Sequence, residues 1–214
     1  MLLLRAYLPL LLRLSALSAA VLIPSALVGL IAARIWAGQG FAFEVPLMLW
    51  IHHHVGSWFA PVAVIMHYVG KTSLAVPLIT LAAVWLHFRK RTGYAAFLIL
   101  STALPTLVML LSKAVFDRPR PMLWPRLIEE SNTSFPSGHS TFAAALATLL
   151  FIIFLHSPKR TLLLTGGIVF TLLMGFSRVY LGVHYPTDVL AGWINGCATV
   201  CAVYFCFFRK YLHK

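Results

Sequence analysis

Long apolar stretches dominate this 214-residue sequence, and they limit what it can fold into more than any other feature. Hydrophobic residues make up 60% of the chain and charged residues 10%, whereas soluble globular domains carry about 25% charged residues. A helix needs about 20 apolar residues to cross the hydrocarbon core of a bilayer. Several stretches reach or approach that length, so the sequence excludes a soluble domain and predicts an integral membrane protein.

These stretches predict an all-α fold, a six-span transmembrane helical bundle that forms a single domain over residues 1–214. Between the first two spans, residues 38–71 are apolar but interrupted by Glu44 and by His, Pro and Gly residues, which predicts interfacial or re-entrant helices. The N-terminal stretch continues past any small-residue cleavage site, so we interpret it as an uncleaved first span. The predicted spans cover residues 14–36, 72–88, 94–112, 138–156, 161–179 and 187–208.

The basic residues between the spans predict how the chain crosses the membrane. With the N-terminus in the cytoplasm, ten of the seventeen Lys and Arg residues fall on the cytoplasmic side, and all five acidic residues fall on the outer side. Both termini are therefore predicted to be cytoplasmic, and loop 113–137 and turn 180–186 to meet on the outer face. The net charge of +12 does not indicate nucleic-acid binding, because the basic residues form short clusters without interleaved aromatic residues.

Two of the polar segments on this outer side flank the loop between the third and fourth spans. The loop opens with Lys113 and continues to Arg120 and Pro121, which makes it cationic and stiffens it. Its far end reads Pro-Ser-Gly-His over residues 136–139, where the fourth span begins. Backbone amides at a helix N-terminus favour an anion, and a glycine lets a ligand approach the backbone. These segments predict an anion-binding site.

A third segment joins the fifth and sixth spans. Ser177 and Arg178 end the fifth span, and Pro186 suits the first position of the sixth helix. Asp188 then lies in the first turn of that helix, and His184 lies just ahead of it. The carboxylate is expected to be close enough to hold one imidazole nitrogen of His184.

Together the three segments resemble the signature of the type 2 phosphatidic acid phosphatase (PAP2) family. That signature consists of a Lys followed by Arg-Pro, then Pro-Ser-Gly-His, then Ser-Arg with a His and an Asp at fixed spacing. All three elements are present here, in order and without a substitution, between residues 113 and 188. The six-span layout also agrees with the membrane branch of the family.

The resemblance implies a role for each residue of the signature. His184 is implied to be the nucleophile that forms a phosphohistidine, and Asp188 to fix its tautomer. His139 is implied to protonate the leaving oxygen and then to activate water. The phosphoryl oxygens would be bound by Lys113, Arg120, Ser137, the Gly138 amide and Arg178.

No cofactor and no metal are expected. A two-metal phosphatase needs several carboxylates to hold its ions. Only Asp117 and Asp188 lie within the motif segments, and Glu129 and Glu130 lie in the loop between them.

Structural alternatives exist for several of these residues. Lys113 could be a snorkelling anchor, Ser137 only a helix N-cap, and Arg178 and Asp188 an intramembrane ion pair. His52, His53 and His54 point in different directions along a helix or strand, so we interpret them as interfacial residues rather than a metal site. Arg118 and Arg126 could bind a second phosphate or be solvated.

The resemblance and the membrane layout imply a metal-independent lipid phosphatase whose partner is a membrane lipid that presents its phosphate at the outer leaflet. The expected location is the inner (plasma) membrane of a bacterium. Undecaprenyl diphosphate is the first expected substrate, with phosphatidylglycerol phosphate and the phosphates of lipid A as alternatives. A lipid phosphotransferase and a non-enzymatic lipid transporter are further alternatives. The sequence does not indicate an oligomeric state.

Overall fold

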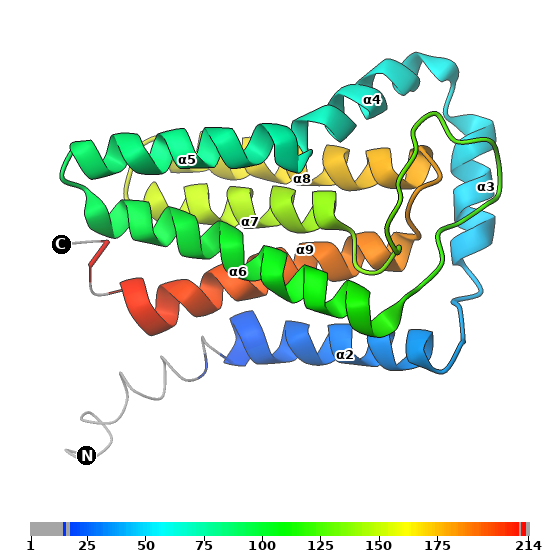
Figure 1. The fold of residues 1–214 in the computed structure, drawn as a ribbon, viewed down its shortest axis with the longest axis horizontal. Helices are drawn as coiled ribbons and strands as arrows, with labels where there is room; N and C mark the ends of the chain where they lie inside the picture. The colour runs from blue at the N-terminus through cyan, green and yellow to red at the C-terminus, as the bar shows by residue number, and fades with distance from the viewer. Residues whose placement is uncertain (1–14, 16–17, 210, 213–214) are drawn as a thin grey trace.

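The computed structural model describes residues 15, 18–209 and 211–212, and every regular element in these ranges is helical (Figure 1). This confirms the predicted all-α class. The elements are η1 (Ser18–Leu22), α2 (Ile23–Trp36), α3 (Glu44–His54), η2 (Ser57–Phe59), α4 (Ala60–Val69), α5 (Thr72–Phe88), α6 (Thr92–Phe116), α7 (Gly138–Ile153), α8 (Arg160–Tyr180), α9 (Pro186–Val203) and η3 (Tyr204–Phe208).

Each predicted span corresponds to a helix, but not every helix is long enough to cross a bilayer by itself. Four helical stretches among the described residues are long and apolar enough, namely η1 with α2, α6, α8, and α9 with η3. Helices α4 and α5 pass the same test together but are bent by 51° at their junction, as in a broken span or a re-entrant loop. Helix α7 has only 16 residues. The structure thus supports four or five spans, and the count of six, like the interfacial placement of residues 38–71, stays a prediction.

The first and third predicted spans do not coincide fully with the described helices. Residues 14, 16 and 17 of the first predicted span lie outside the described residues. Helix α6 continues to Phe116, four residues beyond the predicted end, so Lys113 lies in its last turn and not in the loop. The helix ends at Asp117, whose φ of 41° is left-handed, a conformation that Asp tolerates better than most residues.

Helices α7 and α9 approach each other closely because two glycines of α9 face the backbone of α7. A Cβ atom at Gly192 would lie 2.6 Å from the Ser137 carbonyl oxygen, and one at Gly196 would lie 2.5 Å from the Thr141 carbonyl oxygen. Small residues four apart permit such contacts between membrane helices. Since the second motif begins α7 and the third runs into α9, this contact sets the register between two parts of the site.

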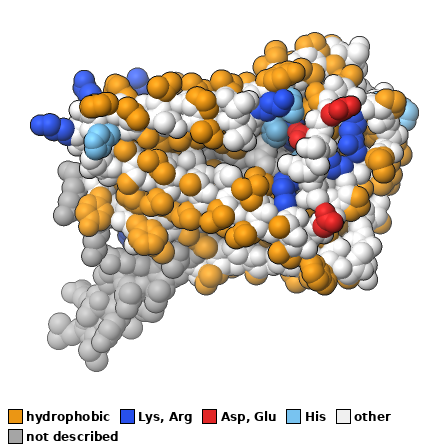
Figure 2. Space-filling view, viewed as in Figure 1, with side chains coloured by type: hydrophobic (Ala, Val, Ile, Leu, Met, Phe, Trp, Pro, Cys, Tyr) orange, Lys and Arg blue, Asp and Glu red, His pale blue; other side chains and the backbone are white. Residues whose placement is uncertain are grey.

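Helices α3 and α4 cover the end of the bundle at which α6 ends and α7 and α9 begin (Figure 1). Buried apolar side chains, including Met48, Phe59, Val179 and Val183, join them to α8 and to the turn that follows it. In Figure 2 the acidic side chains and several basic and His side chains gather at this end, and hydrophobic side chains cover much of the helices beside it. The fold therefore brings the three motifs to one end of the bundle.

Candidate active site

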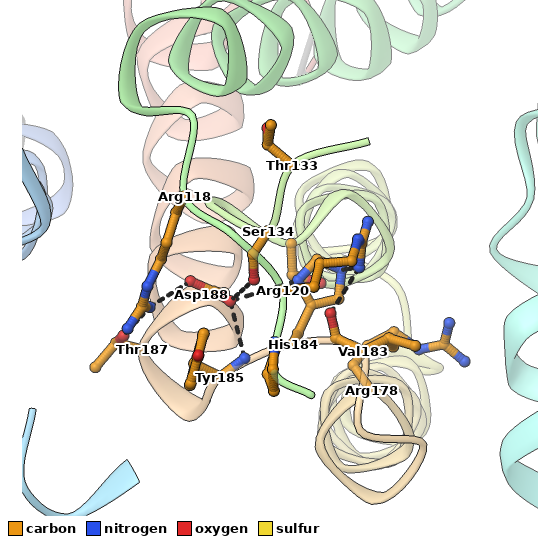
Figure 3. A network of polar contacts seen from close by, with 12 residues as sticks. Arg118, Arg120, Thr133, Ser134, Arg178, Val183, His184, Tyr185, Thr187 and Asp188 are labelled. Carbon is orange, nitrogen blue, oxygen red and sulfur yellow. Dashed lines mark hydrogen bonds and ion pairs between the residues drawn. The ribbon is translucent and has the colours of Figure 1, made fainter. Parts of the chain in front are cut away.

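The loop after α6 and the turn between α8 and α9 come together at the start of α9, as Figure 3 shows. His184 and Asp188 are buried at the centre of this network. Arg118 and Arg120 reach them from the loop, which also contributes Ser134. The predicted meeting of these two segments is thus observed.

The imidazole of His184 lies between a cation and a carboxylate. Its Nε2 atom is 3.1 Å from Arg120 Nη1, and its Nδ1 atom is 3.6 Å from Asp188 Oδ2. A guanidinium can only donate, so Nε2 accepts and the ring proton resides on Nδ1, facing Asp188. Burial lowers the pKa of His184 to about 3 although Asp188 opposes this, and Arg120 and Lys113 add to the lowering. The ring is therefore neutral, and its Nε2 lone pair faces the guanidinium of Arg120.

Asp188 is held by three donors, two from the loop after α6 and one from the turn before α9. Its Oδ1 atom accepts a hydrogen bond from Arg118 Nη1 at 2.6 Å. Its Oδ2 atom accepts from the Tyr185 amide at 2.8 Å and from the Ser134 hydroxyl. These bonds fix the carboxylate against the His184 ring.

Arg118 is a structural element of the site, so its interpretation as a solvated side chain is wrong, and binding of a second phosphate by it stays a prediction. It is buried, and besides Asp188 it donates to Glu44 Oε2 at 2.7 Å and to Thr187 Oγ1 at 3.0 Å. Its guanidinium lies 4.0 Å from the centroid of the Tyr185 ring. Although burial opposes it, the Asp188 and Glu44 carboxylates raise the pKa of Arg118. In the sequence Glu44 only interrupts an apolar segment, but a lone acid in such a segment indicates a buried cationic partner.

Three further cations of the motifs are oriented mainly by backbone carbonyls. Arg120 donates to the carbonyls of Val183 at 2.6 Å and Asn132 at 2.7 Å. The Lys113 ammonium donates to the Thr133 carbonyl, and the residue is buried, which contradicts the snorkelling alternative. We call Lys113, Arg120 and Arg178 the cation cradle.

Arg178 is fully buried at the end of α8. It donates to the Ala63 carbonyl at 3.2 Å and to Ser177 Oγ at 3.2 Å, and its Nη1 atom lies 3.1 Å from His67 Nδ1. Its carboxylate neighbour is Glu130 at 4.0 Å, whereas Asp188 pairs with Arg118. Among the described residues no ion pair joins Arg178 to Asp188, so that alternative is wrong.

His139 lies in the first turn of α7 and is packed against the junction of α4 and α5. Its Nε2 atom is 2.9 Å from the His67 carbonyl oxygen, and the two imidazole rings stack with centroids 5.2 Å apart. A Cβ atom on Gly70 would lie 2.3 Å from the His139 ring, so only glycine permits this packing. His67 belongs to no motif, and nothing in its spacing could have identified it.

Ser137 and Gly138 differ in their surroundings. Ser137 is fully buried, its amide donates to the Asp188 carbonyl at 3.0 Å, and its hydroxyl oxygen accepts from the Ser140 amide as the N-cap of α7. The N-cap alternative is therefore observed, and phosphate binding by Ser137 stays a prediction. Gly138 lines the cavity described next.

A cavity of about 890 Å³ connects the polar groups to the apolar faces of α5 and α6. At the polar end, several motif side chains line it together with Glu130 and His67. From there it continues between the two helices toward His87 near the end of α5. The motif residues that line this active-site cavity are Lys113, Arg120, Gly138, His139 and His184.

One group of side chains has the composition of a metal site. The ligand atoms of His67, Glu130 and His139 all lie within 4.8 Å of one another. However, Arg178 Nη1 lies 3.1 Å from His67 Nδ1 and 4.0 Å from Glu130 Oε1, so a cation placed there would meet a guanidinium. The surroundings suit an anion better.

The three consecutive histidines lie outside this group. They form the exposed end of α3, where His52 stacks on Trp124 and His54 on Trp50. Within the described part of the chain, they contribute to no cluster of metal-ligating side chains. Their interpretation as interfacial residues stays a prediction.

The apolar helices define an integral membrane protein, and the polar site at their end is rich in buried basic side chains. Residues 94–212 match the model of the PAP2 superfamily, so the chain belongs to this superfamily. The family predicted from the three motifs is confirmed, and the chain is a PAP2-type phosphatase, a hydrolase.

Relatives and solved structures agree with this assignment. Phosphatidylglycerophosphatase B of Bacillus subtilis is 34% identical over 145 residues, which are 65% of this chain and 70% of that protein. The undecaprenyl-diphosphatase of Sulfolobus acidocaldarius is 31% identical over 163 residues, 74% of this chain and 75% of that protein. The crystal structure of a transmembrane PAP2-type phosphatidylglycerolphosphate phosphatase from Bacillus subtilis superposes with a TM-score of 0.74 at 27% identity, and the match covers 88% of this chain and 96% of that one.

Proposed function

We propose that this protein hydrolyses a lipid phosphate, with undecaprenyl diphosphate as its substrate. The observation that carries the proposal is the active-site cavity, because a single space holds His139 and His184 at one end and apolar side chains of α5 and α6 along its length. A lipid could place its phosphate in the cation cradle and its chain between these helices. Geometry of this kind suits a substrate that stays in the bilayer.

The arrangement supports a two-step reaction through a phosphohistidine. The Nε2 lone pair of His184 attacks phosphorus, forming the P–N bond while the P–O bond to the lipid breaks and His139 protonates the leaving oxygen. Water then attacks phosphorus and gives a proton to His139, and the P–N bond breaks to release phosphate. Asp188 keeps the Nδ1 proton of His184 in place during both steps. The cation cradle would stabilise the charge on the phosphoryl oxygens.

A lipid diphosphate fits the charges of the cavity. Besides Lys113 and Arg120, the cavity is lined by Lys71, an exposed residue at the start of α5 that belongs to none of the three motifs. A second phosphoryl group would meet this additional cation. For undecaprenyl diphosphate, the cradle would hold the terminal phosphate and Lys71 the phosphate that remains on the lipid.

Phosphatidylglycerol phosphate is the second candidate. A second apolar cavity of about 570 Å³ shares Ala75, Ile79 and Phe142 with the active-site cavity and extends along the other side of α5. Two adjoining apolar spaces would suit a lipid with two acyl chains. The phosphates of lipid A and a phosphotransferase reaction are alternatives. Identifying the products of the reaction distinguishes them.

The orientation follows from the charge distribution. We place the site on the outer face of a bacterial inner membrane and both termini in the cytoplasm, because the short basic segments at Arg89–Arg91 and Lys159–Arg160 lie at the opposite end of the bundle from the site. This placement would let the enzyme act on a carrier lipid after its use in cell-wall assembly.

The test is release of inorganic phosphate by the purified protein in detergent with EDTA present. We expect faster release from undecaprenyl diphosphate than from phosphatidylglycerol phosphate, inhibition by orthovanadate, and loss of turnover in His184→Ala. His53→Ala, which changes an exposed histidine of α3, is the matched control. Turnover in His184→Ala near that of the wild type would refute the assignment of His184 as the nucleophile. Turnover that requires a lipid acceptor would indicate a transferase, and lipid transport retained in His184→Ala would indicate a transporter.

A further inference from the structure

The carboxylate of Glu130 lies among the cations that are expected to bind phosphate. Its Oε1 atom is 3.5 Å from His67 Nδ1 and 4.0 Å from Arg178 Nη1, and its Oε2 atom is 3.7 Å from Arg120 Nη2. The side chain is 16% exposed and lines the active-site cavity. An anion of the protein itself is thus present where the substrate's anion is expected.

Glu130 does not orient these cations. All three distances are longer than a hydrogen bond, and the buried Oε1 atom has no hydrogen-bond partner among the described residues. Arg120 and Arg178 are held by the carbonyls of Val183, Asn132 and Ala63. Removing the Glu130 charge therefore leaves in place the carbonyl acceptors that position the guanidinium groups.

A phosphoryl group and this carboxylate would compete for the same positive charges. Two anions a few ångströms apart repel each other, and the repulsion is stronger in a partly buried site than in water. We propose that Glu130 is a built-in occupant of the phosphate subsite, which every phosphoryl anion must displace, and that this competition determines how tightly the enzyme holds its substrate and product. The inference rests on the proposed phosphate site.

An internal competitor has a quantitative signature. Displacing the same carboxylate costs the same free energy whichever anion enters, so loss of the occupant should tighten the binding of different phosphoryl anions by the same factor. For one ionic competitor in a mostly buried site, we expect about a tenfold decrease in Kd, equivalent to ~1.4 kcal/mol.

The experiment is isothermal titration calorimetry of the full chain in detergent with orthophosphate and, separately, orthovanadate. Glu130→Gln keeps the size of the side chain and removes its charge. Glu129→Gln is the matched control, because Glu129 is exposed, lies on the same loop and makes no ion pair with the described residues. We expect both anions to bind Glu130→Gln about tenfold more tightly than the wild type, and Glu129→Gln to bind as the wild type does.

Weaker or unchanged binding in Glu130→Gln would overturn the proposal, since it would mean that Glu130 supports the cations or does not reach them. Tightening by different factors for the two anions would also overturn it. Glu130→Ala should tighten binding in the same way, which separates the loss of charge from any effect of the glutamine amide. Because the titration does not depend on turnover, wild-type binding without phosphatase activity would refute the proposed reaction alone, and failure of every variant to bind would refute the phosphate site.

Discussion

Replacing Arg118 with methionine should both destabilise the protein and slow its reaction. The guanidinium donates to Asp188 at 2.6 Å and to Glu44 at 2.7 Å, and the side chains of both acids are at most 2% exposed. Removing one partner of a buried ion pair costs about 3–5 kcal/mol because it leaves an uncompensated buried charge. Here one substitution leaves two such carboxylates, so we expect a loss near the upper end of that range.

Arg118→Met should slow the reaction because Asp188 loses the donor to its Oδ1 atom and no longer holds the His184 ring in one orientation. We expect kcat to fall by about 10- to 100-fold, as when a group that orients a catalytic metal ligand is removed. Arg118→Lys should rescue only part of both effects, because a single ammonium cannot match a planar guanidinium that binds two carboxylates.

The assay is the free energy of unfolding in mixed micelles, measured beside kcat. Arg126→Met is the matched control, since Arg126 is half-buried on the same loop and donates only to the Pro121 carbonyl among the described residues. The double variant with Glu44→Gln should lose less stability than the sum of the single variants, because one of the orphaned charges is then absent. Wild-type stability in Arg118→Met would refute the reasoning.

The protonation of His184, the charge of Lys71 and the packing of Gly196 can each be tested. Nitrogen NMR of labelled histidines should show His184 neutral and protonated on Nδ1 down to about pH 5, because the folded protein lowers its pKa to about 3 from an ordinary value of about 6.5. The free energy of unfolding should accordingly fall as the pH drops from 6.5 toward 3. Titration of His184 near pH 6.5 would contradict this prediction. Lys71→Gln should raise KM for a lipid diphosphate at least about threefold more than for a lipid monophosphate, which is the scale of one exposed ionic contact. Equal effects on the two KM values would remove the support for a diphosphate substrate. Gly196→Leu should abolish folding or activity, because its Cβ atom would lie 2.5 Å from a carbonyl oxygen of α7. Gly166→Leu is the control, since a Cβ atom there would meet nothing within 4 Å, and it should behave as the wild type in expression and thermal melting.

The sequence by itself determined the helical class and the residues that carry the family signature. Apolar length and helix start signals act within one segment, so α5 was predicted at its observed bounds and Pro186 at its observed position as the first residue of α9. The pairing of His184 with Asp188 is also local, since they are four positions apart across a helix start. Local rules were sufficient for these features because the interacting groups are neighbours in the chain.

The tertiary structure alone decided which charges meet. Arg118 pairs with Glu44 across 74 residues, and His67 reaches Arg178 across 111 residues, distances over which no spacing rule operates. The position of Glu130 among the cradle cations likewise depends on where the loop lies against α4 and α8. A buried charge needs a partner of opposite sign or a polar contact, but only the packing of α3, α4 and the loop decides which group supplies it.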